Sequence, residues 1–133
     1  RKQFSEGISL FYSPCQTCHG EDGNGLPAMA TPLNNSEWVT GDKDKLIAIV
    51  LYGLSGPVKV NNKTYKSPEI SGEMPGLAHN KDITDEAIAQ VLSYIRKSWN
   101  NNASAITRDE VNKIRQHWNE RQQAFTEEEL KKW

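Results

Sequence analysis

The sequence predicts a mostly α-helical domain with a single small β-hairpin. Three segments share one helix-start pattern, a threonine with an apolar residue directly before it and another apolar residue four positions after it. These threonines are Thr84, Thr107 and Thr126. Residues 58–65 alternate between apolar and polar side chains on both sides of an Asn-Asn pair, which is typical of two short strands joined by a tight turn. We therefore expect an all-α fold with this hairpin as its β-structure.

Length and composition set limits on the partners of the chain. Its 133 residues, 36% of them hydrophobic, fit one principal domain. The formal net charge of −1 argues against nucleic acid or an anionic membrane surface as a general partner. The longest apolar run, residues 46–54, is too short to cross a bilayer, so we expect no membrane span in this chain. The start at Arg1 without a methionine suggests processing or excision from a longer protein.

The first elements are a helix and a loop. Phe4, Ile8 and Phe11 lie on one face at helical spacing, and Pro14 ends or kinks that helix. Residues 20–25 contain three glycines, which predicts a tight loop.

The middle of the chain contains a second helix, the hairpin and a loop. Residues 42–52 begin with an aspartate, place apolar residues at helical spacing, and stop at Gly53, which predicts a helix with a core-facing side. After the hairpin, residues 72–76 are so rich in glycine and proline that we expect an irregular loop.

The three threonine-capped helices complete the chain. The helix after Thr84 carries a continuous apolar stripe, whereas the helix after Thr107 is highly charged and its stripe is thinner. Glu110 and Glu129 follow their threonines by three positions and complete capping boxes. Because the polar stretch at residues 100–104 separates the first of these helices from the others, we expect a main domain over 1–104 and a helical C-terminal extension over 105–133.

The pattern Cys15-Gln16-Thr17-Cys18-His19 predicts which cofactor the chain binds. Two thiols three positions apart with a histidine directly after them form the acceptor pattern for covalently attached c-type haem. Cys15 and Cys18 can add to the two vinyl groups of one porphyrin, and His19 then becomes the proximal iron ligand. A zinc site would need a second pair of ligands at recognisable spacing, and a thioredoxin-like pair would need a preceding strand, and neither is present in the sequence.

The second axial ligand separates electron carriers from catalysts and sensors. Met74 is favoured, because a rigid Gly-Pro loop can present its thioether to the iron. Its alternative role is to fill a gap in the core. His79 is the rival ligand, whereas Met29 is too near the proximal histidine in sequence, and His117 is expected to be exposed on a polar helix. The proximal imidazole also needs an acceptor for its other nitrogen, for which Pro32 and Leu33 are candidate carbonyls.

These residues make the chain resemble the class I, mitochondrial-like cytochromes c over about residues 4–99. The resemblance implies that fold around one covalent haem, with a small hairpin before the distal methionine loop. In that family a proline carbonyl receives the imidazole proton and a methionine followed by proline is the distal ligand, and these correspond to Pro32 and Met74 here. The helix-crossing positions of the family correspond to Gly7, Phe11, Val91 and Tyr94.

More narrowly, several segments look like the haem domains that accompany bacterial sugar and alcohol dehydrogenases, many of them quinoproteins. These are residues 36–39, 51–54 and 93–99, with the hairpin before Met74. The resemblance implies a periplasmic or otherwise extracytoplasmic carrier that takes electrons from a dehydrogenase and passes them to a respiratory acceptor. Trp38 and Tyr65 are candidate contacts to the porphyrin or its propionates, although ordinary core packing is an equal alternative for both.

Two other functions remain open at this stage. A haem peroxidase or gas sensor would leave the sixth position of the iron open, and it would bind carbon monoxide rapidly when reduced. A binding module would use residues 105–133 to dock a larger enzyme, which is compatible with electron transfer. No acid, base or nucleophile stands in a recognisable catalytic arrangement, so we expect an electron carrier and not an enzyme.

Overall fold

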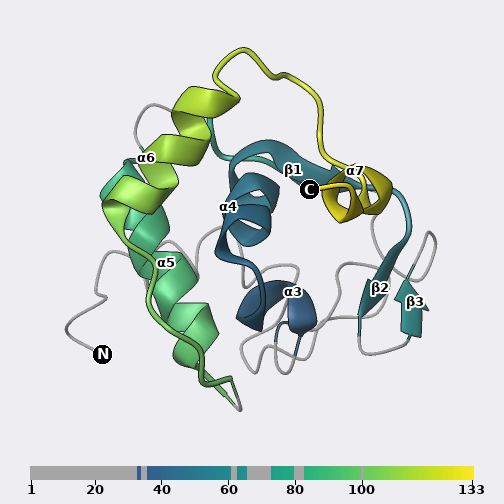
Figure 1. The fold of residues 1–133 in the computed structure, drawn as a ribbon, viewed down its shortest axis with the longest axis horizontal. Helices are drawn as coiled ribbons and strands as arrows, with labels where there is room; N and C mark the ends of the chain where they lie inside the picture. Colours follow the sequence, from purple (N-terminus) through teal and green to yellow (C-terminus); the bar gives the residue numbers. More distant parts are fainter. Residues whose placement is uncertain (1–32, 34–35, 61–62, 66–72, 80–82, 100) are drawn as a thin grey trace.

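The computed structural model describes residues 33, 36–60, 63–65, 73–79, 83–99 and 101–133. The predicted N-terminal helix, the glycine loop and the haem motif at 15–19 lie outside these residues. Among the described residues, the elements occur in the following order (Figure 1): α3 (Glu37–Thr40), α4 (Lys43–Tyr52), β1 (Gly53–Ser55), β2 (Val58–Val60), β3 (Lys63–Tyr65), β4 (Glu73–Pro75), α5 (Asp85–Lys97), α6 (Arg108–His117) and α7 (Glu127–Lys131).

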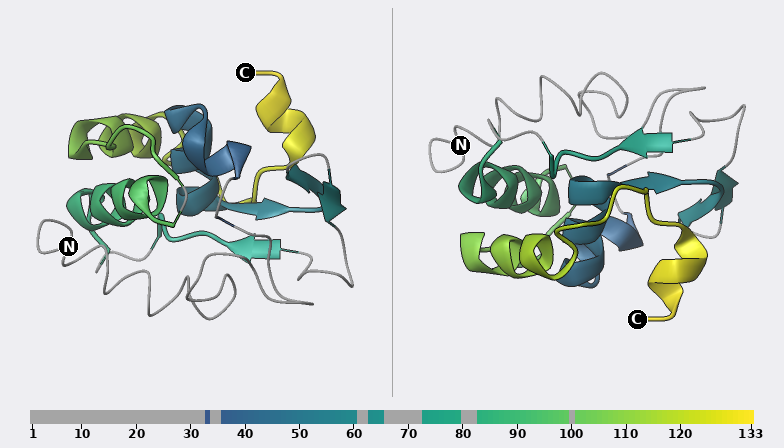
Figure 2. Two further views of the ribbon diagram at one scale, coloured as in Figure 1. Left: turned by 90° about the horizontal axis from the view of Figure 1, so that it is seen from below. Right: turned by 90° about the horizontal axis from the view of Figure 1, so that it is seen from above.

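Helices α3, α4, α5 and α6 form one packed group, and the strands extend from it. Helix α6 packs against both α5 and α4, and the short α3 packs against α4 and α5. Figure 2 shows α5 and α6 side by side at one end of the molecule, with the strands at the other end. None of the described helices has both the length and the apolar composition that a bilayer span requires.

The predicted helix starts are confirmed. Asp42 caps α4 by accepting hydrogen bonds from the backbone N–H groups of Asp44 and Lys45, at 2.8 and 3.3 Å. Thr84 caps α5. Thr107 and Thr126 form complete capping boxes at the starts of α6 and α7, in which the carboxylate of the glutamate three positions later accepts a hydrogen bond from the backbone N–H of the cap. Each box satisfies N–H groups that have no partner within the helix.

One hydrophobic core joins the helices of the predicted main domain to those of the predicted extension. Helix α4 is buried along residues 46–52, and the predicted stripe of α5 is buried as well. Val111 and Ile114 of α6, Phe125, and Leu130 of α7 belong to the same core. Burial of such side chains stabilises a fold by roughly 1.5–3 kcal/mol each. The division of the chain at residue 104 stays a prediction.

The strands form two separate antiparallel pairs in the described part of the chain. The predicted hairpin is confirmed, because β2 pairs with β3 and Val58 lies opposite Tyr65. The second pair, β1 with β4, was not predicted, and the prediction of an irregular loop at 72–76 is wrong for Glu73–Pro75. Tertiary pairing outweighs weak local strand preference. Proline is tolerated in β4 because it stands at the end of a short strand, where a ladder hydrogen bond can be lost at little cost.

Candidate cofactor site

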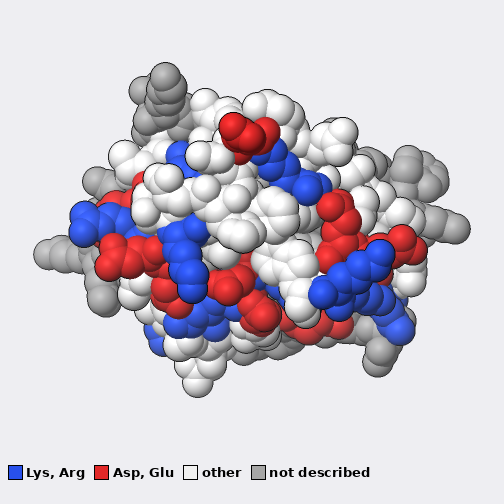
Figure 3. All heavy atoms as spheres, turned by 45° about the horizontal axis from the view of Figure 1, so that its top comes forward, with Lys and Arg blue, Asp and Glu red and all other residues white. Residues whose placement is uncertain are grey.

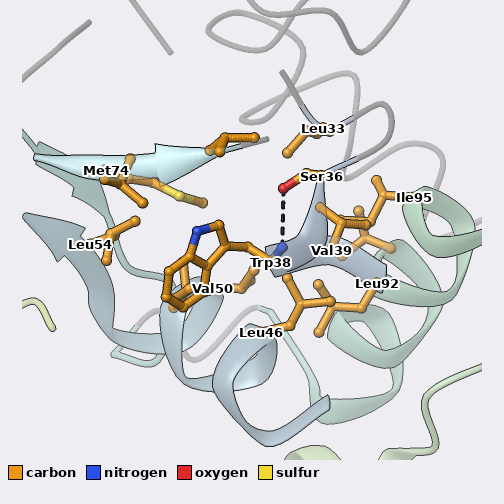
Figure 4. Close-up of a pocket in the computed structure, with 14 residues that line it drawn as sticks. Leu33, Ser36, Trp38, Val39, Leu46, Val50, Leu54, Met74, Leu92 and Ile95 are labelled. Atoms are coloured by element: carbon orange, nitrogen blue, oxygen red, sulfur yellow. Dashed lines mark hydrogen bonds between the residues drawn. The ribbon is translucent and has the colours of Figure 1, made fainter. Parts of the chain in front are cut away.

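An apolar pocket lies between the helices and the strands (Figure 4). The empty space among its lining residues amounts to about 650 Å³, including space open to solvent. The described residues that line it are Leu33, Ser36, Trp38, Val39, Leu46, Ile49, Val50, Leu54, Val58, Val60, Met74, Val91, Leu92 and Ile95.

Two helices build one wall of the pocket. Leu46, Ile49 and Val50 of α4 have the spacing that brings side chains onto one helical face. In α5, Val91 and Leu92 lie four and three positions before Ile95, so these side chains also share one helical face. The apolar periodicity that predicted the core sides of these helices therefore also predicts part of the pocket wall.

Met74 enters the pocket from the strands. It lies in the middle of β4, directly opposite Leu54 of β1, and both side chains line the pocket. Figure 4 shows the thioether sulfur directed from β4 toward the pocket. Among the described lining residues, Met74 alone carries an atom that commonly ligates iron.

Trp38 forms another side of the pocket and is fixed by both of its nitrogens. Its backbone N–H donates to the Ser36 hydroxyl at 3.2 Å, where Ser36 caps α3. Its indole Nε1 donates to the carbonyl of Lys59 in β2 at 2.8 Å. The second bond joins α3 to the hairpin and holds the indole against the pocket.

Tyr65 does not line the pocket. It packs against Val58 and Val60, whose side chains do. Its predicted approach to a porphyrin stays a prediction.

Leu33 lines the pocket, and its carbonyl already has two donors. The backbone N–H of Ser36 donates to it at 3.3 Å and the side-chain Nδ2 of Asn101 at 3.0 Å. The same Nδ2 donates to the carbonyl of Ile95 at 2.8 Å, so Asn101 ties the segment around Leu33 to the end of α5. A carbonyl acceptor with two donors has no remaining lone pair of normal geometry.

Arg96 is a buried cation behind the pocket wall. Its side chain donates to the carbonyls of Val39, Gly41 and Ser104 at 2.8, 3.1 and 2.7 Å. Burial lowers the pKa of the guanidinium, and the negative charge of Glu110 partly opposes that shift. Because two of the acceptors lie at the end of α3, Arg96 fixes this short helix against α5.

The two described histidines lie elsewhere. His79 is exposed and does not line the pocket, and its Nε2 lies 2.9 Å from the carbonyl of Arg121. His117 is exposed on α6, as predicted. Neither position supports His79 or His117 as an iron ligand in this arrangement.

Five residues of the predicted site and its alternatives lie outside the described residues: Cys15, Cys18, His19, Met29 and Pro32. Of the remaining predicted residues, the structure brings together Leu33, Trp38 and Met74.

The roles of Asn101 and Arg96 were not predicted from the sequence. Asn101 stands in a stretch of three asparagines, a pattern typical of exposed linkers, and no local signal marks it as buried. The sequence could have indicated that Val58 and Val60 line the pocket, because strand alternation places both on one face of the hairpin.

The pocket fits a haem by the chemistry of its walls. The wall is largely apolar, as is a porphyrin macrocycle, and among its described residues Met74 carries a thioether, a group that can ligate haem iron.

Comparisons with known proteins agree with this chemistry. A family model described as cytochrome c oxidase, cbb3-type, subunit III matches residues 2–95. Cytochrome c-552 of Thermus thermophilus is 32% identical over 111 residues, which cover 77% of this chain and 79% of that protein.

Two further relatives are subunits of dehydrogenases. The cytochrome c subunit of the quinone alcohol dehydrogenase of Gluconobacter oxydans is 30% identical over 113 residues, which cover 84% of this chain. The gluconate 2-dehydrogenase cytochrome c subunit of Pantoea cypripedii is 32% identical over 104 residues, which cover 74% of this chain. The matches span only 22% and 21% of the lengths of these subunits.

Proposed function

Since this chain belongs to the cytochrome c family and is an electron-carrier domain, we propose that it binds one haem c through Cys15, Cys18 and His19, with Met74 as the sixth iron ligand. In this function it relays single electrons from a dehydrogenase to a respiratory acceptor, and it performs no substrate chemistry of its own.

The position of Met74 is the observation that carries the proposal. Its sulfur is directed into an apolar pocket that Leu33 also lines. Leu33 follows His19 by fourteen positions in the sequence. A segment of that length is long enough to bring His19 back to the pocket that Leu33 lines. A proximal histidine and a distal thioether on two sides of this pocket would give His/Met ligation.

The residues around the pocket tune and protect the bound group. When bound, haem supplies a one-electron couple at its iron. The apolar side chains of α4, α5 and the hairpin exclude water from it, and a methionine ligand and a low-polarity site both raise the reduction potential. Because the carbonyl of Leu33 already has two donors, Pro32 is assigned as the acceptor for the second nitrogen of His19.

The proposed partners follow from the relatives. Two of the similar proteins are cytochrome c subunits of dehydrogenases, so a dehydrogenase is the proposed donor. Covalent haem attachment to a motif such as residues 15–19 happens outside the cytoplasm, so an extracytoplasmic compartment is the proposed location. Figure 3 shows lysine, arginine, aspartate and glutamate side chains interspersed over one face of the molecule. Recognition through that face would therefore depend on local charge pairs and not on one strongly charged patch.

The Met74→Ala protein tests the ligation, with Met29→Ala as the matched control because the chain has two methionines. We expect Met74→Ala to keep its covalent haem, to lose the weak far-red sulfur-to-iron band of the oxidised protein, and to have a lower potential. Met29→Ala should change none of these. An unchanged spectrum and potential in Met74→Ala would exclude Met74 as the ligand.

Carbon monoxide distinguishes the carrier from a haem peroxidase or gas sensor. The reduced parent protein should bind carbon monoxide slowly at neutral pH, and Met74→Ala should bind it rapidly. Rapid binding by the parent would instead indicate an open sixth position.

A further inference from the structure

Residue Phe125, from the C-terminal extension, pairs with β1 on the edge opposite β4. Its backbone N–H donates to the carbonyl of Gly53 at 3.0 Å, and its carbonyl accepts from the N–H of Ser55 at 2.8 Å. These two bonds form a parallel bridge between Leu54 and Phe125. Leu54 also lies opposite Met74 in β4, so β1 is held between Phe125 and the methionine strand. Figure 2 shows the connector before α7 running beside β1.

The side chain of Phe125 anchors this bridge. It is 1% exposed and is surrounded by the rings of Tyr52, Trp118 and Trp133, with centroid separations of 6.2, 5.3 and 5.5 Å. The guanidinium carbon of Arg121 lies 3.7 Å from the centre of the Phe125 ring, close enough for a cation–π contact. The backbone bridge therefore rests on a fixed, buried side chain.

The same region of the extension also holds the residues that follow Met74. Arg115 donates from Nη1 to the carbonyl of Ala78 at 3.0 Å and from Nη2 to the carbonyl of Ile83 at 3.3 Å. Its Nε lies 2.8 Å from Oδ1 of Asp85, an ion pair without regular hydrogen-bond geometry. His79 contacts the carbonyl of Arg121. The chain is thus tied to the extension on both sides of the Met74 position, through β1 before it and through Ala78, His79 and Ile83 after it.

We propose that Phe125 is a positioning residue for Met74, and that the C-terminal extension keeps the thioether in the pocket by holding β1 and residues 78–79 in place. This inference rests on the proposed function, because it takes Met74 as the iron ligand. In this proposal, residues 115–125 help to position an iron ligand. The docking hypothesis gave the extension a role only in binding a larger enzyme.

The test measures how easily the sixth ligand is displaced. Imidazole is titrated into the oxidised holoprotein. Binding is followed by the shift of the Soret band in every variant, and also by the loss of the far-red band in proteins that have it. Phe125→Leu keeps an apolar side chain but loses the ring contacts, and we expect its apparent imidazole affinity to rise at least tenfold. Arg115→Met, which removes the bonds to Ala78 and Ile83, is the second variant, and we expect a smaller rise of about threefold.

Val111→Ala is the matched control. Val111 is 0% exposed in α6, which packs on α5 and α4, so the substitution removes a buried side chain from the extension away from the contacts to β1. A rise in imidazole affinity for Val111→Ala equal to that for Phe125→Leu would show that Phe125 contributes only general stability, and it would overturn the proposal.

Amide hydrogen exchange separates failure of this inference from failure of the ligation. Phe125→Leu should increase exchange at residues 73–79 well above its effect on α5, whereas Val111→Ala should not. If Met74→Ala and the parent bind imidazole equally, the proposed ligation fails, and exchange still decides whether Phe125 holds the strand. Unchanged exchange at 73–79 in Phe125→Leu would overturn the positioning role even where Met74 is the ligand.

Discussion

Gly53 and Met74 approach so closely that a Cβ atom at position 53 would overlap the carbonyl oxygen of Met74. On another side the same Cβ would lie 3.4 Å from the Cβ of Ala124 in the extension. Gly53 also has a φ of +93°, a conformation that L side chains rarely adopt. A glycine at this position therefore lets β1 fit between the methionine strand and the extension.

The Gly53→Ala protein should lose stability because of the positive φ at this position and because the new Cβ would overlap the carbonyl oxygen of Met74. Gly56→Ala is the matched control, because Gly56 has a φ of +82° but a Cβ there would meet nothing within 4 Å. Backbone strain alone costs about 1–3 kcal/mol, so we expect Gly56→Ala to fall in that range and Gly53→Ala to lose at least about 1 kcal/mol more. Chemical denaturation measures both. Equal losses would mean that β1 can move away from β4 at little cost.

Arg96→Met should destabilise the fold, because it leaves the carbonyls of Val39, Gly41 and Ser104 without their donor. Hydrogen bonds to a charged group contribute about 1.5–3 kcal/mol each, and the relieved desolvation of the cation offsets part of the loss. We expect a net loss of about 2–3 kcal/mol in the free energy of unfolding. Lys97→Met, at the exposed neighbouring position, should stay within about 0.5 kcal/mol of the parent. An Arg96→Met protein with the same free energy of unfolding as the parent would contradict the role of Arg96 in fixing α3 against α5.

Ser93→Ala tests the junction between α5 and the extension. The Ser93 hydroxyl is buried, accepts from the N–H of Ile106 at 2.8 Å and donates to the carbonyl of Ile106 at 3.1 Å. Its removal leaves two buried backbone groups without this partner, so a loss of about 1–3 kcal/mol is expected in thermal or chemical unfolding. A change below about 0.5 kcal/mol would indicate that water replaces the hydroxyl.

The stability of the protein should carry a pH dependence from Glu110. The backbone N–H of Thr107, which donates to Oε1 at 2.9 Å, holds the pKa of Glu110 below its ordinary value of 4.5, and Lys43 acts in the same direction. The folded state therefore binds a proton less readily than the unfolded state. The stabilisation is complete above about pH 4.5 and is lost as pH falls through the lower pKa of the folded state.

Glu110→Gln isolates this contribution, because glutamine can keep the capping box without the charge. At pH 6 the variant should be less stable than the parent by about 0.3–1 kcal/mol, and the difference should shrink toward zero on acidification. Denaturation curves between pH 6 and pH 3 measure it. A difference that is constant with pH would show that the carboxylate charge contributes nothing.

The sequence by itself determined where four helices begin, because each of them has a capping residue at its N-terminus. The capping residues Asp42, Thr84, Thr107 and Thr126 act through backbone groups within three positions, so their effect does not depend on distant contacts. The same holds for the hairpin, where alternation gives the face on which Val58 and Val60 lie. The haem motif is likewise a local pattern, and its assignment to Cys15, Cys18 and His19 stays a prediction.

Only the tertiary structure decided where Met74 lies and what holds it there. Three residues of β4 have weak local preference for a strand, and they form one because β1 offers a partner that is itself paired with Phe125, fifty-one positions after Met74. The burial of Arg96 and Asn101 was decided in the same way, since both serve carbonyl groups brought close by packing. Contacts between residues distant in sequence leave no periodic pattern along the chain, and sequence periodicity therefore could not predict them.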